Sequence, residues 1–157
     1  MNGVNLEKEI NRKIAVVFVT DVVGFSTSME IDENQTLQNF RICKKILENL
    51  FSEHGGRIFN TAGDSILAEF SSAVSAVICA SEFQKLIHER NSSQSLPING
   101  KMEFRVGLNM GDVIVEGENL YGEGVNVASR LEALAQPNGV SLSKSISDTL
   151  SVMKSAN

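Results

Sequence analysis

The sequence predicts a single α+β domain whose mixed or antiparallel sheet is of the split βαβ kind. The chain has 157 residues, which is one domain's length and enough to bury a real core. Short β-branched runs alternate with longer helical patterns in the order β-α-β-β-α-β-β-α-β-α. No internal repeat or low-complexity tract interrupts that order.

The first elements are the clearest. Residues 1–12 are polar and charged and predict a lead-in segment. An unbroken apolar run then predicts a strand at 14–20 that is buried on both faces. Asp32 supplies capping chemistry for a helix that ends at Gly55. The remaining elements are expected in this order: strands at 57–61 and 64–70, a helix begun by Ser71 and Ser72, strands at 104–110 and 113–115, a helix at about 125–134, a strand at 140–142 and a helix near 146–153.

Three connections carry turn or loop signals. Residues 91–100 contain serines, a proline and a glycine, and predict a loop with local disorder. Gly111 and Asp112 form a dipeptide suited to a tight hairpin. Residues 118–124 predict a glycine-bearing loop that leads into the next helix.

Two acidic residues stand at the ends of predicted strands. Asp21 follows the buried strand, and Gly24 lies in the next turn, where backbone N–H groups are available. Asp64 stands beside Gly63 in a second turn. The two carboxylates could converge on one or two Mg²⁺ ions that clamp phosphate oxygens. The alternative is that Asp21 merely caps the turn that follows it.

A third group of polar residues lies on the helix after Gly124. Asn126 and Arg130 are four residues apart and project from one helical face. An amide beside a guanidinium suits a sugar and a developing negative charge on phosphate. The alternative is a solvated face on which Arg130 pairs with a glutamate, and the candidates are Glu89, Glu123 and Glu132. The apolar residues expected to face the core are Val127, Leu131 and Leu134.

Composition and charge exclude several classes of protein. The formal net charge is −5 and basic residues do not cluster, which argues against a partner that is nucleic acid or an anionic membrane surface. No apolar run is long enough to span a bilayer, and the first residues lack the features of a signal peptide, so we expect a cytoplasmic protein. Cys43 and Cys79 are expected to be reduced, buried and inert. His54 and His88 lie at helix ends and are not expected to be catalytic.

Four ordered segments together resemble the class III nucleotide cyclase catalytic domain, the bacterial adenylate/guanylate cyclase type, over about residues 13–143. They are Val-Thr-Asp-Val-Val-Gly-Phe-Ser, Thr-Ala-Gly-Asp-Ser-Ile-Leu-Ala-Glu-Phe, Phe-Arg-Val-Gly-Leu-Asn-Met-Gly-Asp-Val and Tyr-Gly-Glu-Gly-Val-Asn-Val-Ala-Ser-Arg-Leu-Glu. The resemblance implies a ferredoxin-like cyclase homology domain with a mainly antiparallel sheet, here residues 13–157. It also implies a head-to-tail homodimer with composite sites at the interface.

The resemblance also implies roles for particular residues. Asp21 and Asp64 would hold two Mg²⁺ or Mn²⁺ ions with help from the Val22 carbonyl. From the partner chain, Asn126 would orient the ribose and Arg130 would stabilise charge on the α-phosphate. The ribose 3′-hydroxyl would attack the α-phosphorus of a nucleoside triphosphate and release pyrophosphate. The backbone expected to cradle the triphosphate consists of Val22, Val23, Gly24, Phe25 and Ser26.

Two departures from the family pattern bear on substrate. Asn60 and Asn119 stand where adenylate cyclases usually have Lys and Asp or Thr, and guanylate cyclases Glu and Cys. An asparagine offers both a donor and an acceptor, so this pair does not name the base. Family members also continue into a strand hairpin that bears a lysine for the triphosphate. The chain stops at Asn157, so we expect the domain to be C-terminally short.

The sequence therefore predicts a nucleotide cyclase that acts on ATP by default. Two alternatives stay open: a guanylate or pyrimidine nucleotide cyclase, and a non-catalytic, degenerate cyclase domain that binds nucleotide or mediates dimerisation. The second alternative would place the domain in a larger protein, with a regulatory domain outside this chain.

Overall fold

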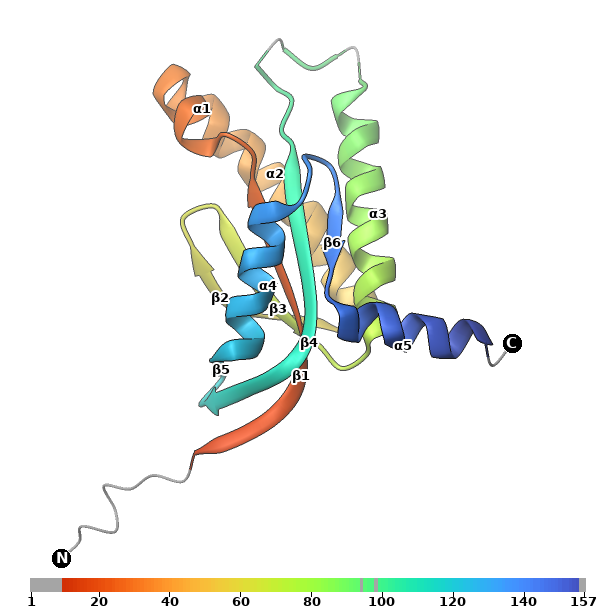
Figure 1. The fold of residues 1–157 in the computed structure, drawn as a ribbon. Coiled ribbons are helices and arrows are strands. Elements are labelled where there is room, and N and C mark those ends of the chain that lie inside the picture. The colour runs from red at the N-terminus through yellow and green to blue at the C-terminus, as the bar shows by residue number, and fades with distance from the viewer. Residues whose placement is uncertain (1–9, 94, 98, 156–157) are drawn as a thin grey trace, which may run out of the picture.

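The computed structural model describes residues 10–93, 95–97 and 99–155, and they form a six-stranded sheet with helices on both faces (Figure 1). The sheet order is β2-β3-β1-β4-β5, and β6 pairs with β4 in parallel while every other pairing is antiparallel. The strands are β1 (Asn11–Val22), β2 (Gly56–Ala62), β3 (Ser65–Phe70), β4 (Phe104–Glu116), β5 (Asn119–Tyr121) and β6 (Val140–Leu142). The helices are α1 (Phe25–Ile31), α2 (Glu33–His54), α3 (Ala73–Asn91), α4 (Glu123–Leu134) and α5 (Lys144–Ser155). The expected α+β class with a mainly antiparallel sheet is confirmed.

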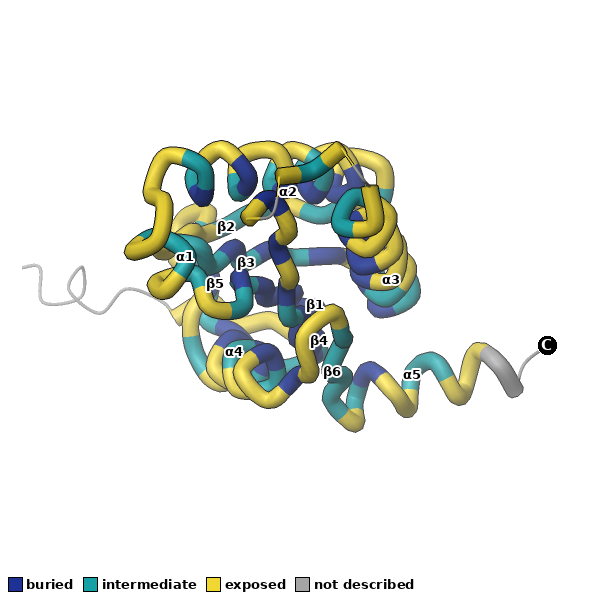
Figure 2. Tube along the Cα trace, turned by 90° about the horizontal axis from the view of Figure 1, so that it is seen from above, coloured by how far each residue is buried: buried dark blue, intermediate teal, exposed yellow. Residues whose placement is uncertain are grey.

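The sheet lies between two helical layers. Helices α2 and α3 cover one face, α4 covers the other, and α5 runs outward from the body (Figure 2). Alternate residues of β1 supply both cores. Val16 and Phe18 pack with α2 and α3, whereas Val17 and Val19 pack in a smaller cluster under α4. This two-sided burial explains the unbroken apolar run in β1 and confirms the prediction of a strand buried on both faces.

The helix boundaries follow the expected capping chemistry. The Asp32 side chain accepts a hydrogen bond from the Gln35 amide at 3.0 Å at the start of α2. Gly55 ends that helix with a φ of 80°, a left-handed conformation that glycine adopts without steric cost. Ser72 caps α3 through the Ser75 amide at 3.2 Å. Among the described residues no helix is long and apolar enough to cross a membrane.

The predicted hairpin at Gly111 and Asp112 is wrong, because β4 runs through both residues without a turn. The glycine serves packing instead. A side chain at Gly111 would meet the Asn109 side chain, and Gly124 at the start of α4 lies directly against this stretch. The side-chain amide of Asn109 also donates a hydrogen bond to the Gly124 carbonyl at 2.9 Å. The close approach of α4 to β4 therefore explains the glycine that resembled a turn signal.

Other boundaries also differ from expectation. The lead-in predicted over residues 1–12 overlaps β1, because Asn11 and Arg12 already pair with the far end of β4; residues 1–9 lie outside the described part. Helix α1 was not predicted, and β5 occupies part of the expected 118–124 loop. The described residues between 91 and 100 include no strand and no helix beyond Asn91, which confirms the loop.

Helix α4 lies so close to β4 that Gly107 cannot carry a side chain. A Cβ at this position would collide with the Ala128 carbonyl and the Glu132 amide, which are backbone atoms that cannot rotate away. We therefore expect Gly107→Ala to lower the free energy of unfolding by about 1–3 kcal/mol, measured by urea denaturation. Gly111→Ala in the same strand is the matched control. Its Cβ would meet mainly a side-chain atom at 3.0 Å, so its loss is expected to be smaller. Equal losses in the two variants would contradict this account of the helix–strand contact.

Candidate active site

The two predicted metal-binding aspartates meet where β1 ends. The Val22 amide donates a hydrogen bond to Oδ2 of Asp64 at 2.8 Å, so the turn after β2 is tied to the residue that follows Asp21. Gly63 precedes Asp64 with a φ of 60°, which fits the predicted glycine turn. Folding thus brings together two carboxyl groups that are 43 positions apart in the sequence.

Asp21 is equipped to bind a cation. Its Oδ1 atom is buried and has no hydrogen-bond partner among the described residues. A buried carboxylate oxygen without a donor is costly unless something positive satisfies it. Carboxylate and carbonyl oxygens are the ligands that Mg²⁺ and Mn²⁺ prefer. The residues at this strand end, Asp21, Asp64 and the Val22 carbonyl, therefore fit the divalent metal ions that the sequence implies.

Arg105 is a site neighbour that sequence analysis did not single out. It lies directly opposite Asp21 in the antiparallel ladder between β1 and β4. The buried Thr20 hydroxyl donates to the Arg105 carbonyl at 2.7 Å and holds the start of β4 against β1. The guanidinium group thereby stands beside a carboxyl-rich strand end, where positive charge also suits a phosphate.

Glu132 is a second residue that the prediction misplaced. It was considered a partner for Arg130 on a solvated face, but it is only 5% exposed and points inward from α4. Burial, followed by a hydrogen bond with Asp21 and the charges of Asp21 and Asp64, raises its pKa to about 8 against the opposing effect of Arg105. The buried residues of α4, Val125, Ala128 and Glu132, recur every three or four positions, which is the signal that could have identified it.

The outward face of α4 carries the other two predicted catalytic residues. Asn126 and Arg130 are both exposed, and the Arg130 guanidinium donates to the similarly exposed Glu123 carboxylate at 3.1 Å, its one ion pair within the described part of the chain. Leu134, expected in the core, is 77% exposed on the same helix. Within one chain, α4 therefore does not bring Asn126 and Arg130 to the pair of aspartates, since its inward face is the one that meets the sheet.

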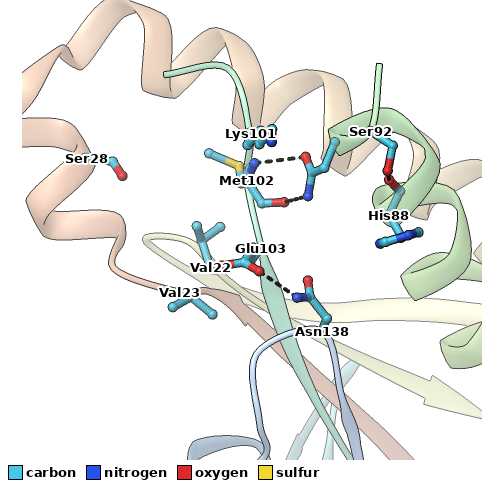
Figure 3. A pocket seen from close by; sticks show the side chains of 10 residues that line it. Val22, Val23, Ser28, His88, Ser92, Lys101, Met102, Glu103 and Asn138 are labelled. Carbon is cyan, nitrogen blue, oxygen red and sulfur yellow. Dashed lines mark hydrogen bonds between the residues drawn. The ribbon is translucent and has the colours of Figure 1, made fainter. Parts of the chain in front are cut away.

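The turn after β1 has the form expected of a phosphate-binding segment. The Val23 amide donates to the Glu103 carbonyl at 2.8 Å, and Gly24 then adopts a φ of 64°. Phe25 and Ser26 begin α1, and amides in the first turn of a helix have no partner within that helix. Beside this turn lies a hollow of about 460 Å³ whose lining includes Val22, Val23, Ser28, Lys101, Glu103 and Asn138 (Figure 3).

The two asparagines predicted to read the base lie on β2 and β5. Asn60 is exposed, and its side chain accepts from the adjacent Thr61 amide at 2.9 Å. Asn119 donates to the Tyr121 hydroxyl at 3.0 Å. Although β2 and β5 are opposite edges of the sheet, Arg57 of β2 donates to the Glu118 carbonyl at 2.7 Å. The curled sheet thus brings the neighbourhoods of both asparagines together.

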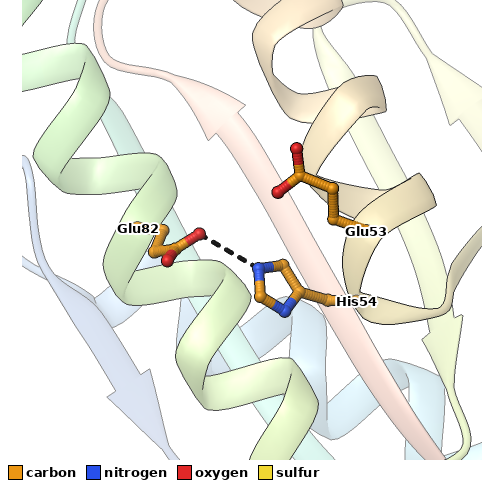
Figure 4. A group of neighbouring side chains, drawn as sticks. All are labelled: Glu53, His54 and Glu82. Carbon is orange, nitrogen blue, oxygen red and sulfur yellow. Dashed lines mark hydrogen bonds and ion pairs between the residues drawn. The ribbon is translucent and has the colours of Figure 1, made fainter.

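A separate group of possible metal ligands lies between the C-terminal end of α2 and the middle of α3. Glu53, His54 and Glu82 place ligand atoms within 4.8 Å of one another, and His54 Nε2 is 3.0 Å from a Glu82 oxygen (Figure 4). The group lies next to Gly56, which pairs with Phe70 of β3, and Phe70 in turn pairs with Val16 of β1. Because Val16 precedes Asp21 by five residues along β1, the group is remote from Asp21. It does not coincide with the predicted metal centre.

The two cysteines are buried, as expected. Burial raises the pKa of the Cys43 thiol, and it raises that of Cys79 to about 12 with a smaller contribution from nearby glutamates. At neutral pH both side chains are therefore unreactive thiols.

Comparison with known proteins identifies related sequences. A model of the adenylate and guanylate cyclase catalytic domain matches residues 6–157. The chain is 43% identical over 141 residues to a putative adenylate cyclase 3 of Rhizobium meliloti, covering 89% of this chain and 24% of that protein. It is 27% identical over 146 residues to an adenylate cyclase of Streptomyces coelicolor, covering 92% and 36%. The chain thus spans about a quarter to a third of the length of these relatives.

Solved structures share the fold. An adenylate/guanylate cyclase/hydrolase from Silicibacter pomeroyi superposes with a TM-score of 0.83 at 29% identity, over 92% of this chain and 84% of the other. The adenylyl cyclase CyaB from P. aeruginosa gives 0.74 at 22% identity, over 88% and 80%. Together with the family match over nearly the whole sequence, these findings show that the chain belongs to the adenylate and guanylate cyclase catalytic domain family.

Proposed function

We propose that this domain is a homodimeric nucleotide cyclase that converts a nucleoside triphosphate, ATP by default, into its 3′,5′-cyclic monophosphate and pyrophosphate. The observation that carries the proposal is that Asp64 accepts from the Val22 amide directly after Asp21, while one buried oxygen of Asp21 has no partner among the described residues. Phosphoryl transfer depends on positioning and on electrostatic stabilisation more than on covalent chemistry, and these residues suit that task.

The metal half of the site lies within one chain. Asp21, Asp64 and the Val22 carbonyl hold two Mg²⁺ or Mn²⁺ ions in this proposal. Bound there, the ions supply Lewis acidity that lowers the pKa of the 3′-hydroxyl and neutralises charge on the leaving pyrophosphate. The turn from Val22 to Ser26 presents backbone amides to the triphosphate. Arg105, opposite Asp21, adds positive charge at the same strand end.

The other half comes from the partner chain. Asn126 and Arg130 are exposed on α4, and Arg130 forms an exposed ion pair with Glu123, which is worth little in water and is easily exchanged. In the dimer, Asn126 orients the ribose so that its 3′-oxygen faces the α-phosphorus. Arg130 donates to the α-phosphate oxygens, where negative charge grows in the transition state. The exposed Leu134 on the same helix supports burial of this face against a second chain.

The base is held by Asn60 and Asn119 in this proposal. Among the described residues, both side chains bond to adjacent backbone or to the exposed Tyr121, so both can turn toward a ligand. Neutral amides form weaker hydrogen bonds than the charged Lys and Asp of typical adenylate cyclases. We therefore expect modest discrimination between bases.

Product analysis tests this function directly. With Mn²⁺ and high protein concentration, ATP, GTP, CTP and UTP are offered separately and the cyclic products are resolved by mass spectrometry. We expect cyclic AMP and pyrophosphate from ATP, with a detectable second cyclic product because the base contacts are neutral. No cyclic product from any of the four, with a dimer confirmed in solution, would refute the cyclase and favour a non-catalytic nucleotide-binding domain.

Removing either metal-binding carboxylate separates catalysis from assembly. Asp21→Ala and Asp64→Ala should each lower turnover to below about one-thousandth of wild type, because the charge that holds the ions is lost. The dimer should persist in analytical ultracentrifugation, since the change lies at a strand end and not on the outward face of α4. Asp148→Ala, which removes an exposed aspartate paired with Lys144 on α5, is the matched control and should keep full activity. Retained activity in the Asp21 or Asp64 variants would reject the two-metal assignment.

A further inference from the structure

Arg57 connects the two edges of the sheet that carry the proposed base-reading asparagines. Its Nη1 atom donates to the Glu118 carbonyl at 2.7 Å, and Glu118 directly precedes Asn119. We propose that Arg57 is a positioning residue, which sets the separation of Asn60 on β2 and Asn119 on β5 and thereby the strength with which the base is held. The inference rests on the proposed function, because it assigns Arg57 a task in the base site described above.

The first argument is that no strand pairing fixes this separation. β2 pairs with β3 and β5 pairs with β4, so β2 and β5 are opposite edges of the sheet. The curl of the sheet nevertheless brings them side by side (Figure 1). Within the part of the chain that the structure describes, Arg57 makes the one hydrogen bond between β2 and the turn that joins β4 to β5. The polar contact that holds these two edges together is therefore a side chain and not a backbone ladder.

The second argument concerns the acceptor. Gly117 and Glu118 form the two-residue turn between β4 and β5, and Gly117 has a φ of 62°. The strand pairing closes at Glu116 opposite Asn119, so the Glu118 carbonyl lies outside the ladder. Arg57 supplies the hydrogen bond that this carbonyl needs. Because Asn119 is the next residue, a shift of the carbonyl moves Asn119 as well.

The third argument is that Arg57 is itself held in place. Its Nη2 atom donates to Glu69 Oε1 at 2.8 Å, and Lys13 Nζ lies 2.6 Å from the other oxygen of that carboxylate. The Glu69 side chain is only 15% exposed. Burial by itself raises the pKa of Glu69, but the hydrogen bonds and charges of Lys13 and Arg57 outweigh burial and lower it, so Glu69 is anionic at neutral pH. The planar guanidinium, fixed at one nitrogen by Glu69, holds its other nitrogen toward the Glu118 carbonyl.

The fourth argument is that Asn60 lies on the same face of β2 as Arg57. Arg57 lies opposite Glu69 on β3. Asn60 lies opposite Leu67, two residues earlier on β3 and therefore on the same face as Glu69. The register of β2 shifts between Ile58 and Asn60, and without this irregularity Asn60 would point to the opposite face, because successive residues of a strand alternate. The contact made by Arg57 and the proposed contact made by Asn60 therefore belong to one face of the sheet.

Ligand binding tests the proposal apart from turnover. With Mn²⁺ present, isothermal titration calorimetry gives the Kd for 3′-deoxy-ATP, which lacks the attacking hydroxyl, and for inorganic tripolyphosphate, which has no base. We expect Arg57→Ala to raise the Kd for 3′-deoxy-ATP about 5- to 30-fold, the effect of weakening one or two hydrogen bonds to the base. The Kd for tripolyphosphate should stay within about twofold of wild type, because this ligand makes no contact with the base-reading residues.

A double-mutant cycle shows whether Arg57 acts through the asparagines. The combined variant Asn60→Ala and Asn119→Ala should also raise the Kd for 3′-deoxy-ATP. In that background Arg57→Ala should add less than about twofold, because the groups that it positions are gone. A loss that added in full would show that Arg57 acts independently of the base site.

Lys13→Ala is the matched control, because Lys13 binds the same Glu69 carboxylate, while the hydrogen bond to the turn comes from Arg57. It should leave both Kd values within about twofold of wild type. Amide hydrogen exchange at Asn119 and Leu120 should be faster in Arg57→Ala than in Lys13→Ala, since only the first change releases the turn.

Four outcomes would each overturn the role of Arg57 and leave the cyclase standing. They are an unchanged Kd for 3′-deoxy-ATP in Arg57→Ala, equal weakening of tripolyphosphate binding, the same loss in Lys13→Ala, and equal amide exchange in the two variants. An unchanged Kd in the combined asparagine variant would overturn the base site, and this inference with it. Absence of any cyclic product in the assay with the four triphosphates would instead refute the cyclase, while the binding data would still decide whether Arg57 positions the nucleotide base.

Discussion

The antiparallel pairing of β1 with β4 is the constraint on which the site depends. It runs from Asn11 opposite Val115 to Val22 opposite Phe104, and it sets Asp21 beside Arg105. Because β1 is buried on both faces, its register cannot slip without moving apolar side chains out of two cores. The end of this strand pair is therefore a rigid place from which to present carboxylates, and the Val22 amide adds Asp64 to it.

In the proposed homodimer, helix α4 links that rigid edge to a site shared between two chains. Its inner face lies on β4 through glycine contacts and buries Glu132, while its outer face exposes Asn126 and Arg130. One chain thus holds the proposed metal groups and the proposed transition-state groups on opposite sides of a single helix. In the proposed homodimer, a second copy would supply the missing half, so that all of these groups would act on one substrate.

The sequence predicted what local patterns encode. The buried strand, the caps at Asp32 and Gly55, and the two aspartates beside glycine turns all depend on neighbouring residues, and the structure agrees with each. The predicted hairpin at Gly111 was wrong because this glycine allows α4 to pack closely on β4, a contact between residues that are not sequence neighbours. Glu132 was misplaced for the same reason, since its burial depends on the packing of α4 against the sheet. The base preferred by Asn60 and Asn119 stays a prediction, because amides suit several partners.

The most direct test of a shared site is to mix two inactive chains. Arg130→Ala should lower turnover about a hundredfold or more, and Asp21→Ala should abolish it, each in its own homodimer. In a heterodimer one of the two sites regains both Asp21 and Arg130. A 1:1 mixture that exchanges freely should therefore recover about a quarter of wild-type activity. Activity that stays at the level of the parent variants, with heterodimers confirmed by mass spectrometry, would show that each chain holds its own complete site.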